Sequence, residues 1–145
     1  MFSPSQKQIG NTIYNEAKKY TKYPDVVTCI GFVESSFGVH LVGDLDKNIY
    51  SASLGVLQFR LQTAKEVIGW RKELKYMLKY SDVKLVSLLI TNHKLSAKLG
   101  ALRLEHYRKK KGLTKAISAH NGGYKNKTYI RKVQKCRQWL FKRDK

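Results

Sequence analysis

Glu34 is the first residue of this sequence whose type and surroundings suggest chemistry. It directly follows Phe32 and Val33, in a chain that has only 10 Asp and Glu against 29 Lys and Arg. Burial of a lone carboxylate disfavours its charged form and raises its pKa. A carboxyl group that keeps its proton near neutral pH can act as a general acid, for example toward the leaving oxygen of a glycosidic bond. The position of Glu34 therefore predicts acid–base chemistry, unless the side chain turns out to solvent at a helix end.

A helix that begins at Pro24 is expected to position this carboxyl group, because proline is favoured in the first turn. The apolar residues of this helix recur at helical spacing, as Val26, Ile30, Val33 and Phe37. Glu34 shares a face with Val27 and Ile30, so we expect it at the edge of the buried stripe. It lies near the helix's C-terminal end, where Gly38 can terminate the helix.

The rest of the chain is mainly helical in pattern. Ser3, Pro4 and Gln6 have the spacing of a capping box at a helix start. Further helices are predicted at 62–68, 71–80, 82–111 (one long or broken helix closed by Gly112), 113–120 and 128–142. Residues 38–61 are rich in glycine and predict irregular loops with a short hairpin. We therefore expect an α+β fold, predominantly α-helical, in which residues 1–145 form a single domain with a small irregular or β-hairpin insertion.

Five short motifs follow one another in the order of a known family. They are Glu34-Ser35-Ser36-Phe37, Ser53-Leu54-Gly55-Val56-Leu57-Gln58, Thr63-Ala64, Gly100-Ala101-Leu102 and Ala119-His120-Asn121-Gly122-Gly123-Tyr124. In turn, they resemble the ESxF signature, SxGLMQ loop, TA pair, G-x-L helix and AYNxG segment of soluble lytic transglycosylases and goose-type lysozymes. The resemblance covers residues 27–124. It implies a lysozyme-like fold and cleavage of the β-1,4 bond between MurNAc and GlcNAc in peptidoglycan.

The resemblance also implies roles for individual residues. Glu34 would act as general acid and then as base, and in transglycosylases the product carries a 1,6-anhydro-MurNAc end. The substrate-binding residues would be Ser51, Ser53, Gly55, Gln58, His120, Asn121 and Tyr124. The two serines are candidates for holding the N-acetyl group, Gly55 would let the backbone approach the sugar, and Gln58 would line the cleft.

His120 departs from the family pattern, which has a tyrosine at this position. A protonated imidazole near Glu34 would lower the pKa of that carboxyl group, whereas a neutral imidazole could hydrogen-bond to it as a phenol does. Tyr124 is a candidate to supply the missing hydroxyl group. A catalytically silent wall-binding relative is the corresponding alternative.

A second carboxylate would decide between two reactions. Asp44 and Asp46 lie between Glu34 and the glycine-containing loop, where goose-type lysozymes carry water-positioning aspartates. Both can instead be turn or cap residues. If either faces the cleft, a hydrolytic lysozyme becomes the alternative to a transglycosylase.

Composition limits the partners and the compartment. The formal net charge of +19 attracts polyanions, among them cell-wall polymers, an anionic envelope surface and nucleic acid. We expect a monomer that binds peptidoglycan and no specific nucleic acid, with the basic helix 128–142 as a further contact to the envelope. A basic nucleic-acid-binding domain is the distant alternative, but it offers no reason for Glu34.

The remaining features predict no cofactor and no metal, because the cysteines and histidines lack ligand spacing. Cys29 and Cys136 are expected as two reduced, buried thiols, with a disulfide as the alternative. No signal peptide is recognisable, and no apolar run approaches the ~18 residues of a membrane span. These features suit an endolysin of phage type, made in the cytoplasm and acting on the cell wall after release.

Overall fold

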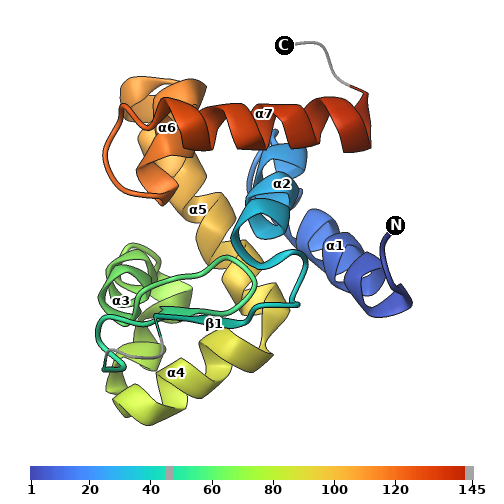
Figure 1. Cartoon of the computed structure of the whole chain (residues 1–145). Coiled ribbons are helices and arrows are strands. Elements are labelled where there is room, and N and C mark those ends of the chain that lie inside the picture. The colour runs from blue at the N-terminus through green and yellow to red at the C-terminus, as the bar shows by residue number, and fades with distance from the viewer. Residues whose placement is uncertain (45–47, 143–145) are drawn as a thin grey trace.

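Eight helices and one small sheet make up the part of the chain that the computed structural model describes, residues 1–44 and 48–142. The elements are α1 (Pro4–Ala17), α2 (Pro24–Ser35), β1 (Val42–Gly43), β2 (Ser53–Leu54), α3 (Leu61–Gly69), the 3₁₀ helix η1 (Lys72–Lys79), α4 (Asp82–Thr91), α5 (His93–Lys111), α6 (Leu113–His120) and α7 (Lys127–Phe141) (Figure 1). The expectation of a predominantly helical chain with a small antiparallel sheet is confirmed. Within the described residues, no helix has both the length and the apolar character needed to cross a membrane.

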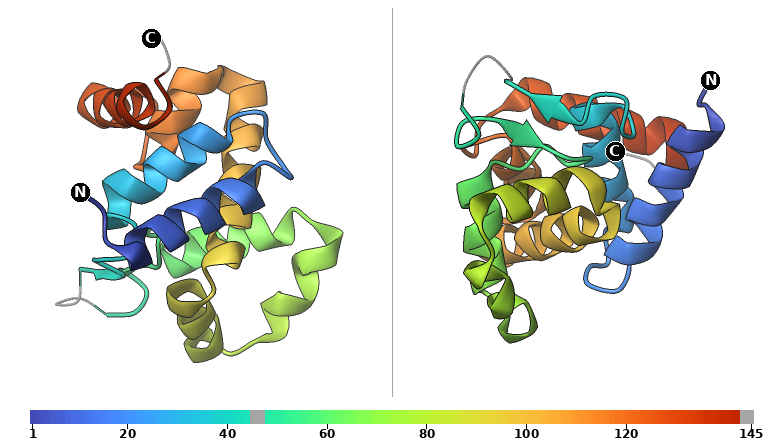
Figure 2. Two further views of the ribbon diagram at one scale, coloured as in Figure 1. Left: turned by 90° about the vertical axis from the view of Figure 1, so that its right-hand side faces the viewer. Right: turned by 90° about the horizontal axis from the view of Figure 1, so that it is seen from below.

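Helix α5 lies at the centre of the fold. It contacts α1, α2, α3, α4 and α6, and its apolar residues Leu95, Ala97, Leu99, Ala101, Leu102 and Leu104 belong to the core. Figures 1 and 2 show α2, α6 and α7 on one side of α5 and the sheet with α3 and α4 on the other. The helix therefore connects the two sides between which the motif residues lie.

Several helix boundaries follow the sequence pattern closely. The capping box at α1 is formed, with Ser3 Oγ accepting from the Gln6 N–H at 3.1 Å and Gln6 Oε1 accepting from the Ser3 N–H at 2.9 Å. The long helix predicted at 82–111 is broken at Asn92, whose side chain accepts from the Leu95 N–H at 3.0 Å and so starts α5. The segment predicted at 71–80 is a 3₁₀ helix rather than an α-helix.

The end of α2 differs from the prediction. Gly38 does not terminate the helix, because Ser36 and Phe37 already adopt left-handed backbone conformations, with φ of 52° and 53°. Non-glycine residues seldom take this conformation, and two in succession need support from their surroundings. The buried Ser35 hydroxyl supplies it: Oγ accepts from the Gly38 N–H at 3.0 Å and lies 2.8 Å from the Val56 carbonyl oxygen. This contact holds the loop after β2 against the end of α2.

Helices α2 and α7 are linked covalently. Cys29 of α2 and Cys136 of α7 form a disulfide, so the expectation of two reduced thiols is wrong. The two residues are 107 positions apart, and only the packing of α7 along α2 brings them together. Beside the disulfide, Arg137 Nε donates to Asp25 Oδ2 at 2.9 Å in a nearly buried ion pair. Both links fix α7 relative to the helix that carries Glu34.

Candidate active site

A polar cleft of about 370 Å³ opens where α2, the sheet, α3, α5 and α6 meet. Its lining residues are Glu34, Asp44, Ser53, Gln58, Phe59, Arg60, Thr63, Arg103, Ala119, His120, Asn121 and Gly122. Six of the residues predicted from sequence are therefore brought together: Glu34, Asp44, Ser53, Gln58, His120 and Asn121. They come from segments separated by as many as 87 positions along the chain, and Figure 1 shows the end of α2 facing the sheet.

Glu34 lies at the C-terminal end of α2 with only 15% of its side chain exposed. Burial disfavours the carboxylate and raises the pKa of Glu34 to about 7. Hydrogen bonds from Tyr129 and Asn121 and the positive charge of Lys132 act in the opposite direction, favouring the carboxylate, but they are weaker than the effect of burial. Near neutral pH both protonation states are therefore populated, so Glu34 can either give or take a proton.

Tyr129, on α7, supplies the hydroxyl group next to Glu34. Its Oη donates to Glu34 Oε2 at 2.9 Å, and the residue is 5% exposed. Burial, followed by the negative charge of Glu34, raises the pKa of Tyr129, so the phenol keeps its proton. Tyr124, the sequence-based candidate for this contact, is instead 38% exposed and lies beside Lys111, outside the cleft.

His120 stands where the resembled motif has a tyrosine, but its ring bonds to a backbone carbonyl group rather than to Glu34. Its Nε2 lies 2.7 Å from the carbonyl oxygen of Leu57, which can only accept, so Nε2 carries the proton. Burial and the nearby charge of Arg103 lower the pKa of His120 to about 4, so the imidazole is neutral at neutral pH. Nε2 is 3.9 Å from Glu34 Oε2. His120 therefore ties α6 to the loop after β2 and adds no positive charge beside Glu34.

Asn121 is oriented by its neighbour in the loop between α6 and α7. Asn126 Nδ2 donates to Asn121 Oδ1 at 2.7 Å, which leaves the amide nitrogen of Asn121 for other acceptors. The amide nitrogen is the end of the Asn121 side chain that can donate to Glu34. Such a donation agrees with the effect of Asn121, which lowers the pKa of Glu34. Asn121 thus has a place in the cleft, as the motif predicts.

The glycine-containing loop meets the sequence-based expectations only in part. Gln58 lines the cleft, but its Nε2 already donates to the carbonyl oxygens of His40, Leu41 and Gly55 at 3.0–3.3 Å, so it also holds the loop together. Gly55 has φ of +80°, and a Cβ there would overlap the carbonyl oxygen of Leu89 in α4. Packing against α4 thus requires a glycine here, and the expected approach of its backbone to a sugar stays a prediction.

The structure places one of the two predicted serines and one of the two candidate second carboxylates in the cleft. Ser53 lines the cleft, whereas Ser51 lies in a turn away from it. Asp44 lines the cleft, and Ser53 Oγ donates to its Oδ2 at 3.5 Å, the outer limit for such a bond. Asp46 lies outside the described residues.

Reasoning from sequence missed two charged residues of the cleft lining, Arg103 and Arg60, and the hydrogen-bond partner of Glu34, Tyr129. Tyr129 has the helical spacing of a core position, since Val133 and Cys136 follow it at i+4 and i+7, and nothing else marks it. Thr63 was noted only as part of a motif. Arg103 is a single charge between the buried Leu102 and Leu104, which is the same kind of signal that identified Glu34.

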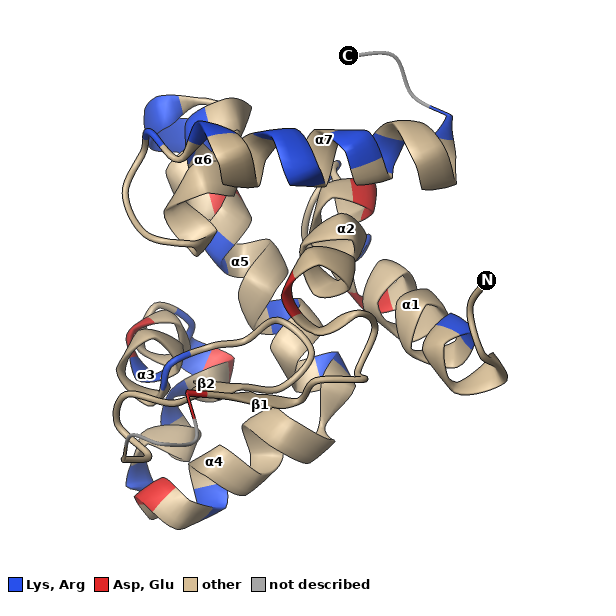
Figure 3. Cartoon of the chain, viewed as in Figure 1, with Lys and Arg blue, Asp and Glu red and all other residues tan. Residues whose placement is uncertain are grey.

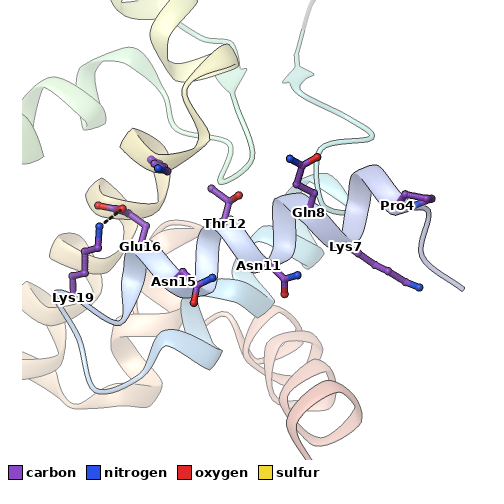
Figure 4. Close-up of a pocket in the computed structure, with 9 residues that line it drawn as sticks. Pro4, Lys7, Gln8, Asn11, Thr12, Asn15, Glu16 and Lys19 are labelled. Atoms are coloured by element: carbon purple, nitrogen blue, oxygen red, sulfur yellow. Dashed lines mark hydrogen bonds and ion pairs between the residues drawn. The ribbon is translucent and has the colours of Figure 1, made fainter.

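A larger hollow, of about 570 Å³, lies on the outer face of α1 (Figure 4). Its lining combines the amide and hydroxyl groups of Gln8, Asn11, Thr12 and Asn15 with Pro4, Glu16 and three lysines. The only carboxylate among its lining residues is Glu16, which is paired with Lys19 Nζ at 2.9 Å. A carboxylate in an ion pair is a poor general acid, so the chemistry is assigned to the cleft with Glu34.

Comparisons of the chain with models of protein families, with curated proteins and with solved structures found no match. The functional assignment therefore depends on the geometry of the cleft and on the motif resemblance.

Replacing Tyr129 with Phe tests the geometry around Glu34. The phenol favours the carboxylate, so its loss is expected to raise the pKa of Glu34 by roughly 1 unit, the size of a hydrogen bond to a charged group. If Glu34 acts as a general acid, it must be protonated to do so, and the alkaline limb of the pH–activity profile should move to higher pH. Tyr124→Phe is the matched control and should leave the profile unchanged. An alkaline limb that stays in place in a folded Tyr129→Phe protein would contradict this arrangement.

Proposed function

We propose that this protein is a peptidoglycan-cleaving glycosidase that cuts the MurNAc-GlcNAc β-1,4 bond, with Glu34 as its general acid and base. The observation that carries the proposal is the buried carboxyl group of Glu34, with a pKa of about 7, in a polar cleft and hydrogen-bonded by Tyr129. A structural carboxylate in a protein of +19 charge would be expected in an ion pair with Lys or Arg, whereas the hydrogen-bond donors to Glu34 are the neutral Tyr129 and Asn121.

The cleft supports a two-step reaction. Protonated Glu34 donates its proton to the glycosidic oxygen as the bond to C1 breaks, and the substrate's 2-acetamido oxygen forms a bond to C1. Tyr129 and Asn121 stabilise the carboxylate that results. The 6-hydroxyl group of the same sugar then attacks C1, the bond from C1 to the acetamido oxygen breaks, and the hydroxyl proton returns to Glu34, which gives a 1,6-anhydro end without consuming water. Incubation with purified peptidoglycan sacculi tests the proposal: it predicts release of soluble glycan fragments, and intact sacculi would contradict it.

The effect of replacing Asp44 distinguishes this transglycosylase reaction from hydrolysis. It lines the cleft but is exposed, with Ser53 at the limit of hydrogen-bonding distance. Replacing Asp44 with Asn is therefore expected to reduce the rate of wall cleavage by less than about threefold, as for a residue outside the transition state. Fragments from the wild-type protein should lack reducing ends that accept borohydride. A severe loss of activity in Asp44→Asn, together with reducible ends, would identify a hydrolytic, goose-type lysozyme instead.

The disulfide bears on where the protein acts. Disulfides form and persist in oxidising compartments such as the bacterial periplasm, and they are rare in the cytoplasm. The bond between Cys29 and Cys136 is buried and joins the helix of Glu34 to the helix of Tyr129. It supports an endolysin-like protein that works on the wall, outside the reducing cytoplasm.

The basic surface supports contact with an anionic envelope. Figure 3 shows Lys and Arg along α7 and where α5 meets α6. Arg131, Lys132 and Lys135 are exposed on α7, and Trp139 of the same helix is 60% exposed. The apolar residues Val133 and Cys136 are buried against the protein, so the outer face of α7 is basic with one aromatic side chain. We propose that this face approaches anionic wall or membrane components.

Salt separates binding of the wall from the chemistry. Raising sodium chloride from about 50 to 500 mM shortens the Debye length from roughly 14 to 4 Å. Cleavage of whole sacculi should therefore slow, whereas turnover of a short soluble muropeptide should change little, because proton transfer occurs within the cleft. Neutralising Lys109, Lys110 and Lys111 together should reproduce part of the loss on sacculi. A parallel loss on both substrates would show that the basic surface does not serve to bind the wall.

A further inference from the structure

Arg103 is a fixed cation inside the cleft. It projects from the central helix α5, and its Nη1 donates to the carbonyl oxygen of Ala119 at 2.8 Å. The guanidinium carbon lies 5.1 Å from the centroid of the Tyr107 ring, so one face of the group is covered by an aromatic side chain. The orientation of this guanidinium is therefore set before any ligand arrives.

Most of the donors of Arg103 have no partner among the residues that the structure describes. A guanidinium carries five N–H groups, and one of them meets Ala119. Within residues 1–44 and 48–142, no ion pair joins Arg103 to a carboxylate. Asp25 and Glu105, by contrast, each have an arginine partner at 2.9 Å. An arginine directed into a polar cleft without an acid is suited to bind a carboxylate of a ligand.

The position of Arg103 limits which carboxylate it can meet. Its charge acts on both His120 and Tyr129, the two side chains that adjoin Glu34. Arg60 lines the same cleft and adds a second positive charge. A group bound here must therefore lie close to the bond that breaks. In peptidoglycan, the lactyl group is attached directly to the reacting muramyl ring and ends in a carboxyl carbon. The carboxylates of the stem peptide lie further from the ring, along the peptide.

We propose that Arg103, assisted by Arg60, forms an anion subsite that binds the free lactyl carboxylate of a muramyl residue. The inference rests on the proposed glycosidase function and predicts that the preferred substrate is a glycan strand from which the stem peptide has been removed. The class of reaction that must supply this substrate is hydrolysis of the amide bond between the lactyl group and the peptide, which converts a neutral amide into a carboxylate.

A purely structural role for Arg103 predicts a different result. By its bond to Ala119, the guanidinium also stabilises the C-terminal end of α6, next to His120 and Asn121. If this were its entire role, loss of Arg103 would weaken the binding of charged and neutral glycans by the same factor. A comparison of two ligands that differ only in that charge therefore separates the two roles.

The experiment measures dissociation constants by calorimetry for the full-length Glu34→Gln protein, which binds without turnover. The ligands are a GlcNAc-MurNAc tetrasaccharide with free lactyl carboxylates and its methyl ester. The acid is expected to bind at least about tenfold more tightly than the ester, as for a charge-assisted hydrogen bond. Adding Arg103→Gln should abolish this ratio, Arg103→Lys should keep part of it, and Arg131→Gln, which removes one charge outside the cleft, should preserve it.

Two results would overturn the anion subsite, and a third would also contradict the proposed function. Equal affinity of the Glu34→Gln protein for acid and ester would exclude the anion subsite. An equal loss of affinity for both ligands on adding Arg103→Gln, with an unchanged melting temperature, would exclude it as well. Both results leave the proposed glycosidase function in place. Binding of neither ligand contradicts the glycan cleft itself, and with it the proposed function.

Discussion

Replacing Glu34 with Gln is expected to reduce the rate of wall cleavage by at least ~100-fold, the lower range for loss of a general acid. Gln has the shape of Glu but no transferable proton. It can still accept the hydrogen bond that Tyr129 donates at 2.9 Å, so the cleft should keep its arrangement. The rates are best compared on the same purified sacculi near pH 6, where Glu34, with its pKa of about 7, is mostly protonated.

Stability provides the control for this variant. The folded-state pKa of Glu34 is raised above the ordinary value of 4.5, so the native state binds this proton more tightly than the unfolded chain. The stability that this proton contributes is present below pH 4.5 and is lost as the pH rises to 7. Glu34→Gln should therefore unfold at an equal or higher temperature than the wild type at pH 8. A folded Glu34→Gln protein that kept more than a tenth of the wild-type activity would remove Glu34 from the mechanism.

Loss of the disulfide is expected to have the largest effect on stability. Joining residues 107 positions apart restricts the unfolded chain, and the chain-entropy relation gives about 4–5 kcal/mol for a loop of this size. Replacing Cys29 and Cys136 together with Ala should lower the free energy of unfolding by an amount of this order. Because α7 carries Tyr129, activity should fall at temperatures where α7 begins to separate from α2.

Reductant provides the matched comparison for this variant. Thermal unfolding of the wild type should shift to lower temperature in dithiothreitol once the buried disulfide is reduced, and approach the value of the double Ala variant. The double Ala variant itself should not respond to dithiothreitol. Identical unfolding curves for wild type and variant under oxidising conditions would show that the cross-link contributes nothing to stability.

Local patterns in the sequence were sufficient to predict the helices and the position of Glu34 at the edge of a buried helix face. The capping box of Ser3 and Gln6 and the apolar spacing around Glu34 depend on residues within a few positions of one another, so the sequence displays them directly. The end of α2 was predicted less well, because the left-handed Ser36 and Phe37 are held by a contact of Ser35 with a loop 21 residues away. Where a distant segment decides the conformation, local propensity is a weak guide.

The partners of Glu34 illustrate the same limit. Tyr129 occupies an ordinary core position of an amphipathic helix, and only the packing of α7 along α2 brings its hydroxyl group to a carboxylate 95 positions away. His120 carried a motif signal, but its neutral state depends on burial and on the bond to Leu57, which no spacing reveals. An unexpected charge among buried residues identified Glu34, and the same kind of signal at Arg103, between the buried Leu102 and Leu104, was overlooked.

Mass spectrometry of the fragments released from purified sacculi tests the central assignment most directly. A glycosidase of the proposed kind should release muropeptides or glycan fragments that end in 1,6-anhydro-MurNAc, each lighter by one water than the hydrolytic product, and Glu34→Gln should release none. Fragments with reducing ends would keep the glycosidase and replace transglycosylation by hydrolysis. The absence of any glycan fragment from sacculi treated with the folded wild-type protein would contradict the assignment.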